Sequence, residues 1–149
     1  TMYNLTVSEA HTFFVGEEEW LVHNDCDSIR LSRNLRTPKG YQAHHVVTCE
    51  CYYAHPMVER AERAGFDING IDNGISLPAD LAESIKANVP RHRGYHLSYS
   101  EYVWMRLDEI QAIAKKNRWN DERIEVAVSS LADALKAALM QSGGGWRLR

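Results

Sequence analysis

The sequence contains few cysteines and no long apolar run. Its 149 residues include three cysteines, Cys26, Cys49 and Cys51, an odd number that is too small for a disulfide framework. No apolar segment approaches the ~20 residues that a membrane-spanning helix requires, and the first residues lack the basic and apolar regions of a signal peptide. The sequence therefore predicts neither a disulfide-stapled scaffold nor a membrane-inserted protein.

The cysteines offer one candidate zinc site. Cys49 and Cys51 are separated by one residue, and His55 follows four residues after the second thiol. A structural zinc site needs four ligands, and this segment does not supply them. Because free cysteine usually behaves as a small buried hydrophobic residue, we interpret the thiols as structural or incidental.

Acidic residues are missing from two stretches of the chain, residues 28–49 and residues 84–100. The net charge is −3, but residues 1–27 hold six acidic residues and no lysine or arginine, so the remainder is net positive. Both acid-free stretches also carry paired histidines. They contain the basic residues Arg30, Arg33, Arg36, Lys39, Lys86, Arg91 and Arg93. This local positive charge favours a polyanionic partner such as nucleic acid.

Residues 2–24, "MYNLTVSEAHTFFVGEEEWLVHN", have the alternation of short strands, with a turn near Gly16. The segment resembles the C-terminal end of Hint domains, the autoprocessing modules of inteins and hedgehog proteins. In them a terminal asparagine attacks its own carbonyl and a histidine polarises that carbonyl. The resemblance implies His11, His23 and Asn24 as autoprocessing residues. Because Asp25 stands where splicing inteins carry a nucleophile, we do not expect splicing.

The rest of the chain predicts a mixture of turns and helices. Residues 28–39 are polar and basic and end in a turn before a strand that contains His44 and His45. We expect short helices over residues 56–65 and 78–88, separated by turns over residues 66–77. Two longer helices follow, for which Ser100 and Asn120 are the candidate caps. The helical spacing of their apolar residues indicates core packing, up to the glycines at 143–145.

Four of the seven histidines occur in two pairs, His44-His45 and His92-x-x-x-His96. The spacing of the second pair is suited to sharing a metal ion, on a helical turn or on a loop that leads into the next helix. Adjacent residues of a strand point to opposite faces. The first pair can therefore serve one compact site only from a strand end, or with the two rings in different roles.

The arrangement "GYQAHHVV … DNGISLP … RHRGYHLSY" resembles the AHH family of nucleases in the His-Me finger (HNH/endonuclease VII) superfamily. The resemblance implies an α+β fold with a ββα-metal core, extended by C-terminal helices and preceded by a short β segment. It also implies a C-terminal toxin domain of a bacterial polymorphic toxin, which agrees with a Hint remnant upstream. We therefore expect a Hint remnant over residues 1–27 and a nuclease domain over residues 28–149.

The resemblance also implies roles for individual residues. His45 would be the general base and Asn73 would orient it, while His44, His92 and His96 would hold one divalent metal ion. The basic residues Arg36, Lys39, Arg91 and Arg93 would bind nucleic acid. Imidazole ligands favour Zn²⁺ or Ni²⁺ in a purified sample, whereas catalysis would use Mg²⁺ or Mn²⁺.

The expected function is thus a metal-dependent endonuclease toxin that hydrolyses phosphodiester bonds, with DNA as the favoured substrate and RNA as the alternative. We expect a secreted or delivered effector that acts in the cytoplasm of a target cell and is neutralised by a cognate immunity protein. Two other interpretations remain open from the sequence. One is a zinc-stabilised binding module without catalysis, and the other is a fragment whose activity is autoproteolysis at Asn24.

Overall fold

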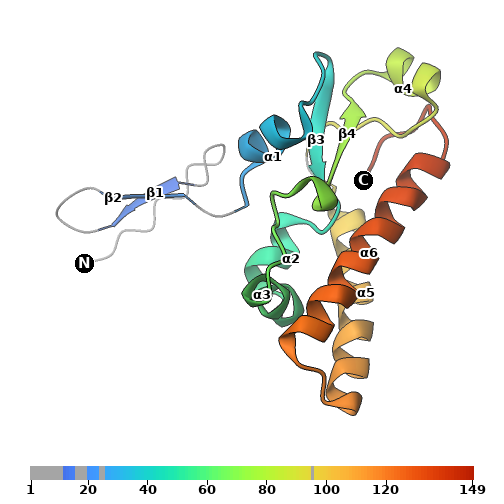
Figure 1. Cartoon of the computed structure of the whole chain (residues 1–149). Coiled ribbons are helices and arrows are strands. Elements are labelled where there is room, and N and C mark those ends of the chain that lie inside the picture. Colours follow the sequence, from blue (N-terminus) through green and yellow to red (C-terminus); the bar gives the residue numbers. More distant parts are fainter. Residues whose placement is uncertain (1–11, 16–19, 24–25, 95) are drawn as a thin grey trace.

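The computed structural model describes residues 12–15, 20–23, 26–94 and 96–149. This part of the chain combines helices with two separate two-stranded antiparallel sheets (Figure 1). The architecture confirms the expected α+β class. His11 and Asn24, two of the predicted autoprocessing residues, lie outside the described residues, and the third, His23, is the last residue of a strand.

The N-terminal sheet confirms the predicted strand pair. Strand β1 covers Thr12–Val15 and strand β2 covers Trp20–His23. They pair antiparallel, with Thr12 opposite His23.

The second sheet carries the histidine pair. Strand β3 covers Tyr41–His45 and pairs antiparallel with β4, Gly74–Pro78, so that His45 lies opposite Gly74. We expected only turns over residues 66–77, and that prediction is wrong from Gly74 onward, because the Asn-Gly turns end there and the short 3-10 helix η1 (Ile71–Asn73) leads into β4. The histidines thus stand at the end of β3, the position from which adjacent residues can serve one site.

Helix α1, Ser28–Leu35, lies in the polar and basic stretch 28–39, where the sequence had not led us to expect a helix. Its start is fixed by Asp27, whose carboxylate accepts the backbone N–H groups of Ile29 and Arg30. The helix packs on the β3–β4 sheet. A Cβ atom on Gly74 would lie 2.6 Å from Cδ1 of the fully buried Leu31, so the glycine allows this close approach. The helix buries a single leucine, Leu31. The apolar periodicity of this stretch is therefore too weak to predict a helix from the sequence.

Helices α2 (Cys49–Ala54) and α3 (Pro56–Arg63) follow β3 and meet at His55. The α3 helix was predicted, with proline at its first position, whereas α2 was not. Nδ1 of His55 accepts the backbone N–H of Met57 at 3.2 Å, and Nε2 lies 3.2 Å from the carboxylate of Asp108. This buried histidine therefore has a structural role as the N-cap of α3.

Helix α4, Leu81–Ala87, begins three residues later than the predicted start at Pro78. Pro78 is the last residue of β4, and the carboxylate of Asp80 caps the helix by accepting the N–H of Glu83 at 2.8 Å.

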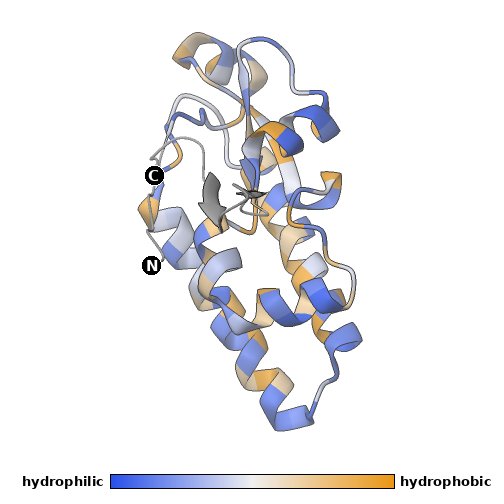
Figure 2. Ribbon diagram, turned by 90° about the vertical axis from the view of Figure 1, so that its left-hand side faces the viewer, coloured by the Kyte–Doolittle hydropathy of each residue, from blue (hydrophilic) through white to orange (hydrophobic). Residues whose placement is uncertain are grey.

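Two long helices, α5 (Leu97–Asn117) and α6 (Asp121–Gln141), complete the core. Asn120 caps α6 as predicted, but Ser100 lies inside α5, which begins three residues before the predicted cap. Figure 2 shows hydrophobic and hydrophilic positions alternating along both helices. Helix α6 packs against α3 and α5, and its buried positions are Ile124, Val128, Leu131, Ala132, Leu135 and Leu139. Among the described residues, no helix is long and apolar enough to cross a membrane.

The last six residues return to the sheet end of the molecule, beside β4 (Figure 1). The N–H of Arg91 donates to the carbonyl of Trp146 at 2.9 Å, and the N–H of Leu148 donates back to Arg91 at 3.0 Å. The N–H of Tyr99 donates to the carbonyl of Arg149 at 2.7 Å. The tail thus holds both ends of the loop that carries His92 and His96.

Candidate metal centre and active site

Three histidines from two distant segments converge at the end of β3. His44 is on the strand, while His92 and His96 lie on the loop that leads into α5. The ring centroid of His44 is 4.9 Å from that of His92 and 4.7 Å from that of His96, and the two loop rings are 5.2 Å apart. One ring nitrogen of each lies within 4.8 Å of the others. The structure therefore brings together the three residues predicted as metal ligands.

The electrostatic setting keeps these imidazoles neutral. His44 is 1% exposed, and burial together with the neighbouring His92 and His96 holds its pKa well below the usual value. Burial lowers the pKa of His92 to about 4, with smaller contributions from His96 and from Arg147. Burial also lowers the pKa of His96. Neutral imidazole is the form that binds metal ions.

The ring nitrogens of this cluster fit a metal ion. Within the described part of the chain, Nε2 of His44 and Nδ1 of His92 are buried and have no hydrogen-bond partner. Buried polar atoms without a partner are costly. A divalent cation at the centre of the cluster would use these lone pairs, so the donor set is suited to a three-histidine site.

Tyr99 closes one side of the cluster. Its ring stacks edge-on against His44 at 5.0 Å and against His96 at 5.5 Å. Its hydroxyl donates to the carbonyl of Val46 at 2.8 Å, which fixes the ring against the loop that follows β3. Burial raises the pKa of Tyr99 far above its usual value, so the hydroxyl remains protonated and serves as a structural donor.

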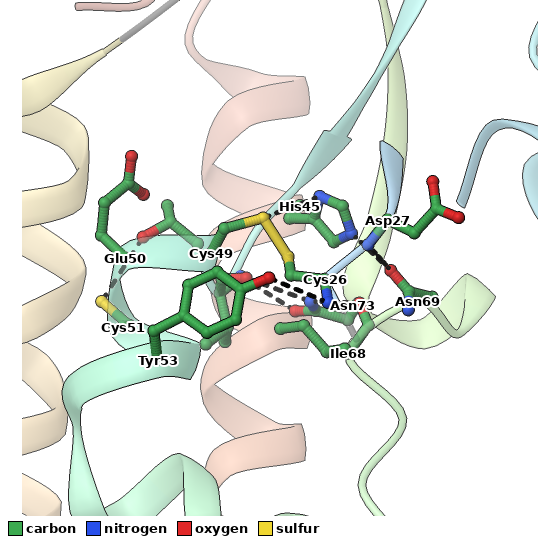
Figure 3. The surroundings of a disulfide bond; sticks show 12 residues. Cys26, Asp27, His45, Cys49, Glu50, Cys51, Tyr53, Ile68, Asn69 and Asn73 are labelled. Atoms are coloured by element: carbon green, nitrogen blue, oxygen red, sulfur yellow. Dashed lines mark hydrogen bonds between the residues drawn. A yellow bond between two sulfur atoms is a disulfide. The ribbon is translucent and has the colours of Figure 1, made fainter. Parts of the chain in front are cut away.

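His45, on the next position of β3, has a different environment (Figure 3). Its Nε2 atom lies 2.9 Å from Oδ1 of Asn69, and the same oxygen accepts the backbone N–H of Asp27 at 2.8 Å. A backbone N–H is always a donor, so it identifies that side-chain atom of Asn69 as the oxygen. Nε2 of His45 must then carry the hydrogen, which leaves the lone pair on Nδ1.

The lone pair of His45 faces a disulfide. Cys26 and Cys49 are joined, and Sγ of Cys49 lies 3.8 Å from Nδ1 of His45. A disulfide sulfur has no hydrogen to donate, so this contact leaves the basicity of Nδ1 intact. Burial lowers the pKa of His45, and the hydrogen bond that its Nε2 donates to Asn69 and the carboxylates of Asp27 and Glu50 oppose that shift. The ring is neutral, and Nδ1 is its proton acceptor.

Asn73, the residue predicted to orient His45, makes its side-chain hydrogen bonds to backbone groups. Its Oδ1 accepts the N–H of Val47 at 2.8 Å, and its Nδ2 donates to the carbonyls of Val47 and Ile68. These bonds fix the chain just after His45, whereas the direct contact with the ring comes from Asn69. Both asparagines precede glycine, so the sequence contained the signal for Asn69 but gave no reason to choose it.

The four predicted nucleic-acid-binding residues lie on two adjoining loops. Arg36 and Lys39 are exposed on the turn before β3, and Arg91 and Arg93 flank His92. Backbone bonds connect these loops at one end of the sheet, because Ala79 donates to Gly40 and His92 donates to Pro78. Within the described residues, Nε of Arg91 is buried without a hydrogen-bond partner.

The structure separates the three residues of the candidate Cys49–Cys51–His55 zinc site. Cys49 is in the disulfide with Cys26, a pairing that the sequence did not predict. Cys51 is a buried free thiol that accepts the hydroxyl of Thr48 and lies 3.8 Å from the carbonyl of Ser100. With His55 bound to Asp108, these residues have structural roles.

The comparisons with known proteins agree with this geometry. The model of the AHH family, described as a nuclease family of the HNH/ENDO VII superfamily with conserved AHH, matches residues 28–135. No curated protein and no solved structure matches the chain. The match spans α1, the β3–β4 sheet and the three clustered histidines, and Ala43-His44-His45 is the motif that names the family. The chain therefore belongs to the AHH nuclease family of the HNH/endonuclease VII superfamily.

Proposed function

We propose that this chain is a metal-dependent endonuclease that hydrolyses phosphodiester bonds with a single metal ion, with DNA as the favoured substrate. The observation that carries the proposal is that the two adjacent histidines at the end of β3 have different surroundings. His44 joins His92 and His96 in a buried cluster of neutral imidazoles, while His45 beside it keeps a lone pair on Nδ1. Membership of the AHH family supports nuclease chemistry.

Each residue of the site has its own role in the proposed reaction. Nδ1 of His45 accepts a proton from a water molecule, and the resulting hydroxide attacks the phosphorus atom. Asn69 holds the ring in the required tautomer, and Asn73 holds the backbone behind it. Arg91 and Arg93 bind the phosphates next to the scissile bond through charge-assisted hydrogen bonds. A divalent cation bound by His44, His92 and His96 would supply Lewis-acid stabilisation of the negative charge.

Plasmid cleavage tests this proposal. The protein should nick supercoiled plasmid in the presence of Mg²⁺ or Mn²⁺ and lose that activity in EDTA, and a panel of metals with DNA and RNA substrates identifies the preferred pair. The His45→Ala variant should lose about 100- to 10,000-fold in rate, the usual contribution of a general base. Full activity in His45→Ala would refute the assignment of the base. A metal-loaded, folded protein without nuclease activity would instead favour a zinc-stabilised binding module.

We further propose that the nuclease is the toxic part of a delivered bacterial effector and that an immunity protein blocks it. The resemblance of residues 2–24 to the end of a Hint domain supports this context, and so does the disulfide, because disulfides form in oxidising compartments. The immunity protein would present acidic residues to the basic loops around His92. Expression of the folded, disulfide-bonded chain in an unprotected host should arrest growth, and His45→Ala should relieve the arrest.

A further inference from the structure

The Cys26–Cys49 disulfide lies directly against the ring of His45, the base in the proposed nuclease reaction. Cys26 precedes α1, and Cys49 begins α2 four residues after His45. Figure 3 shows the imidazole between the two sulfurs and Asn69. The ligand atoms of Cys26, His45 and Cys49 all lie within 4.8 Å of one another.

We propose that reduction of this disulfide converts it into a second metal site, a Cys₂His site for Zn²⁺ that uses His45 as a ligand and thereby shuts off the nuclease. The inference rests on the proposed function only for the second part, the loss of activity. The first part, metal binding by reduced Cys26 and Cys49, stands on the geometry alone.

The tautomer of His45 makes the ring suitable as a ligand. Because Asn69 binds the hydrogen on Nε2, the lone pair on Nδ1 points toward Sγ of Cys49. Metal-bound histidines usually donate their other ring N–H to a protein oxygen, which fixes the orientation of the ring. Asn69 is such a partner, so the group that would orient His45 as a ligand is already in place in the oxidised protein.

The ligand atoms of the proposed site favour Zn²⁺ over Mg²⁺ and Mn²⁺. Two thiolates and one imidazole are the ligands that Zn²⁺ prefers, and Mg²⁺ and Mn²⁺ prefer oxygen. The third cysteine does not compete for the ion, because Cys51 is buried and held by Thr48 and Ser100. The proposed site has three protein ligands and leaves a fourth position for water.

Reduction of the disulfide needs two electrons and two protons, and an external dithiol supplies them. The dithiol attacks Sγ of Cys49, the less buried half of the disulfide, and is oxidised to its own disulfide as the two protein sulfurs take up two electrons and two protons. Zn²⁺ then displaces the protons of both thiols and takes the lone pair of Nδ1. With this lone pair engaged, His45 no longer accepts a proton from water.

Metal binding by the oxidised and reduced full chain tests the site without any measurement of nuclease activity. The reductant should be a trialkylphosphine, which is oxidised to its oxide with the oxygen of water, because dithiols bind zinc themselves. With Co²⁺ as the probe, the reduced protein should bind one more ion than the oxidised protein and gain a sulfur-to-cobalt charge-transfer band. In a His92→Ala background, which removes a ligand of the three-histidine cluster, the extra ion and the band should remain.

Cysteine variants provide the matched controls. Cys26→Ser and Cys49→Ser should lose the band, and Cys51→Ser should keep it. Equal metal content in both redox states, a band lost in Cys51→Ser, or unfolding of the chain on reduction as measured by circular dichroism would overturn the site.

Nuclease assays then test the consequence separately. Stoichiometric Zn²⁺ should slow the reduced wild-type protein about a hundredfold more than it slows Cys49→Ser, as expected for the loss of a general base. Equal inhibition of the two proteins would overturn the switch while leaving the metal site intact. Absence of nuclease activity in every form would refute the proposed function and leave the spectroscopic result unaffected.

Discussion

Oδ1 of Asn69 lies 2.9 Å from Nε2 of His45 and accepts the backbone N–H of Asp27 at 2.8 Å. The oxygen thus connects the start of α1 to the residue at the end of β3. This connection fixes both the position of the imidazole ring and the ring nitrogen that carries the hydrogen. Asn69 is 1% exposed, so bulk water does not replace it as an acceptor. In the proposed reaction Asn69 is a positioning residue for the base.

Replacement of Asn69 should reduce the nuclease rate without abolishing metal binding. Asn69→Ala removes the acceptor, so kcat should fall about 10- to 100-fold, as for other partners that orient active-site histidines. Asn69→Asp keeps an acceptor oxygen and adds a negative charge, which favours the protonated ring of His45. It should therefore recover much of kcat and move the acidic limb of the pH–rate profile to higher pH.

The control for this series is Asn117→Ala on the exposed end of α5, where the amide only donates to the carbonyl of Ile113. Its rate and pH profile should match the wild type. An Asn69→Ala variant with an unchanged pH profile and an unchanged kcat would remove Asn69 from the reaction.

Removal of any one imidazole of the three-histidine cluster should weaken metal binding. His44→Ala, His92→Ala and His96→Ala each delete one of three ligands, so we expect at least a tenfold weaker affinity for Zn²⁺, since loss of a group that only hydrogen-bonds to a ligand already costs about that much. Isothermal titration of the oxidised protein measures this affinity. The control is His55→Asn, because asparagine retains the capacity to cap α3. Unchanged affinity in all three alanine variants would locate the metal elsewhere.

The stability of the metal-free protein should fall in acid because of the same cluster. His92 has a pKa of about 4 in the folded chain and about 6.5 when unfolded. Between these values the unfolded state binds the proton and the folded state does not, so the free energy of unfolding decreases as the pH falls. For His92 alone the full loss is about 3 kcal/mol.

Denaturant unfolding of the EDTA-treated protein between about pH 7 and pH 4 measures this dependence. The His92→Gln variant cannot bind the proton in either state, so its stability should decline less steeply over the same range. If the two proteins have parallel pH profiles, burial of His92 does not oppose its protonation.

The sequence predicted the parts of the fold that have a strong local signal. The apolar period of α5 and α6, the Pro56 start of α3 and the Asn120 cap are properties of neighbouring residues, and all of them are present. The paired histidines pointed to the cluster because their chemistry is unusual in a core. These signals do not depend on how distant segments meet.

The missed features depend on tertiary contacts. Gly74 begins a strand because β3 lies beside it. A side chain at this position would collide with Leu31 of α1, which only the folded structure reveals. Asn69, and not Asn73, contacts His45 because η1 turns the second asparagine toward the backbone of Val47. The Cys26–Cys49 bond likewise requires the residues before α1 to lie beside the first residue of α2, which residue spacing does not reveal.

Reduction should also lower stability. The disulfide closes a loop between residues 23 positions apart, which in the chain-entropy treatment stabilises the fold by about 3 kcal/mol. The denaturant midpoint of the metal-free protein should therefore decrease on treatment with phosphine. Cys51→Ser provides the control, since it should show the same redox difference as the wild type. A midpoint that does not depend on reductant would mean that the bond contributes no net stability.

The tail formed by residues 144–149 should prove necessary for the metal centre, although it lies beyond the residues that match the family. A Cβ atom on Gly144 would overlap the carbonyl oxygen of Ser84 and lie 3.0 Å from Cα of Ile85. Because this neighbour is the backbone of α4, relief requires the tail to move, at a cost of about 1–3 kcal/mol. Gly144→Ala should therefore displace the tail that is hydrogen-bonded to Arg91 and loosen the His92 loop.

The measurable result for Gly144→Ala is a lower Zn²⁺ affinity together with a lower denaturant midpoint. Met140→Ala, which shortens an exposed side chain at the second-last residue of α6, should change neither quantity. The two effects should be coupled, because the tail is hydrogen-bonded to Arg91 and Tyr99 at the two ends of the loop. A Gly144→Ala protein that is destabilised but binds zinc as tightly as the wild type would show that the loop is held without the tail.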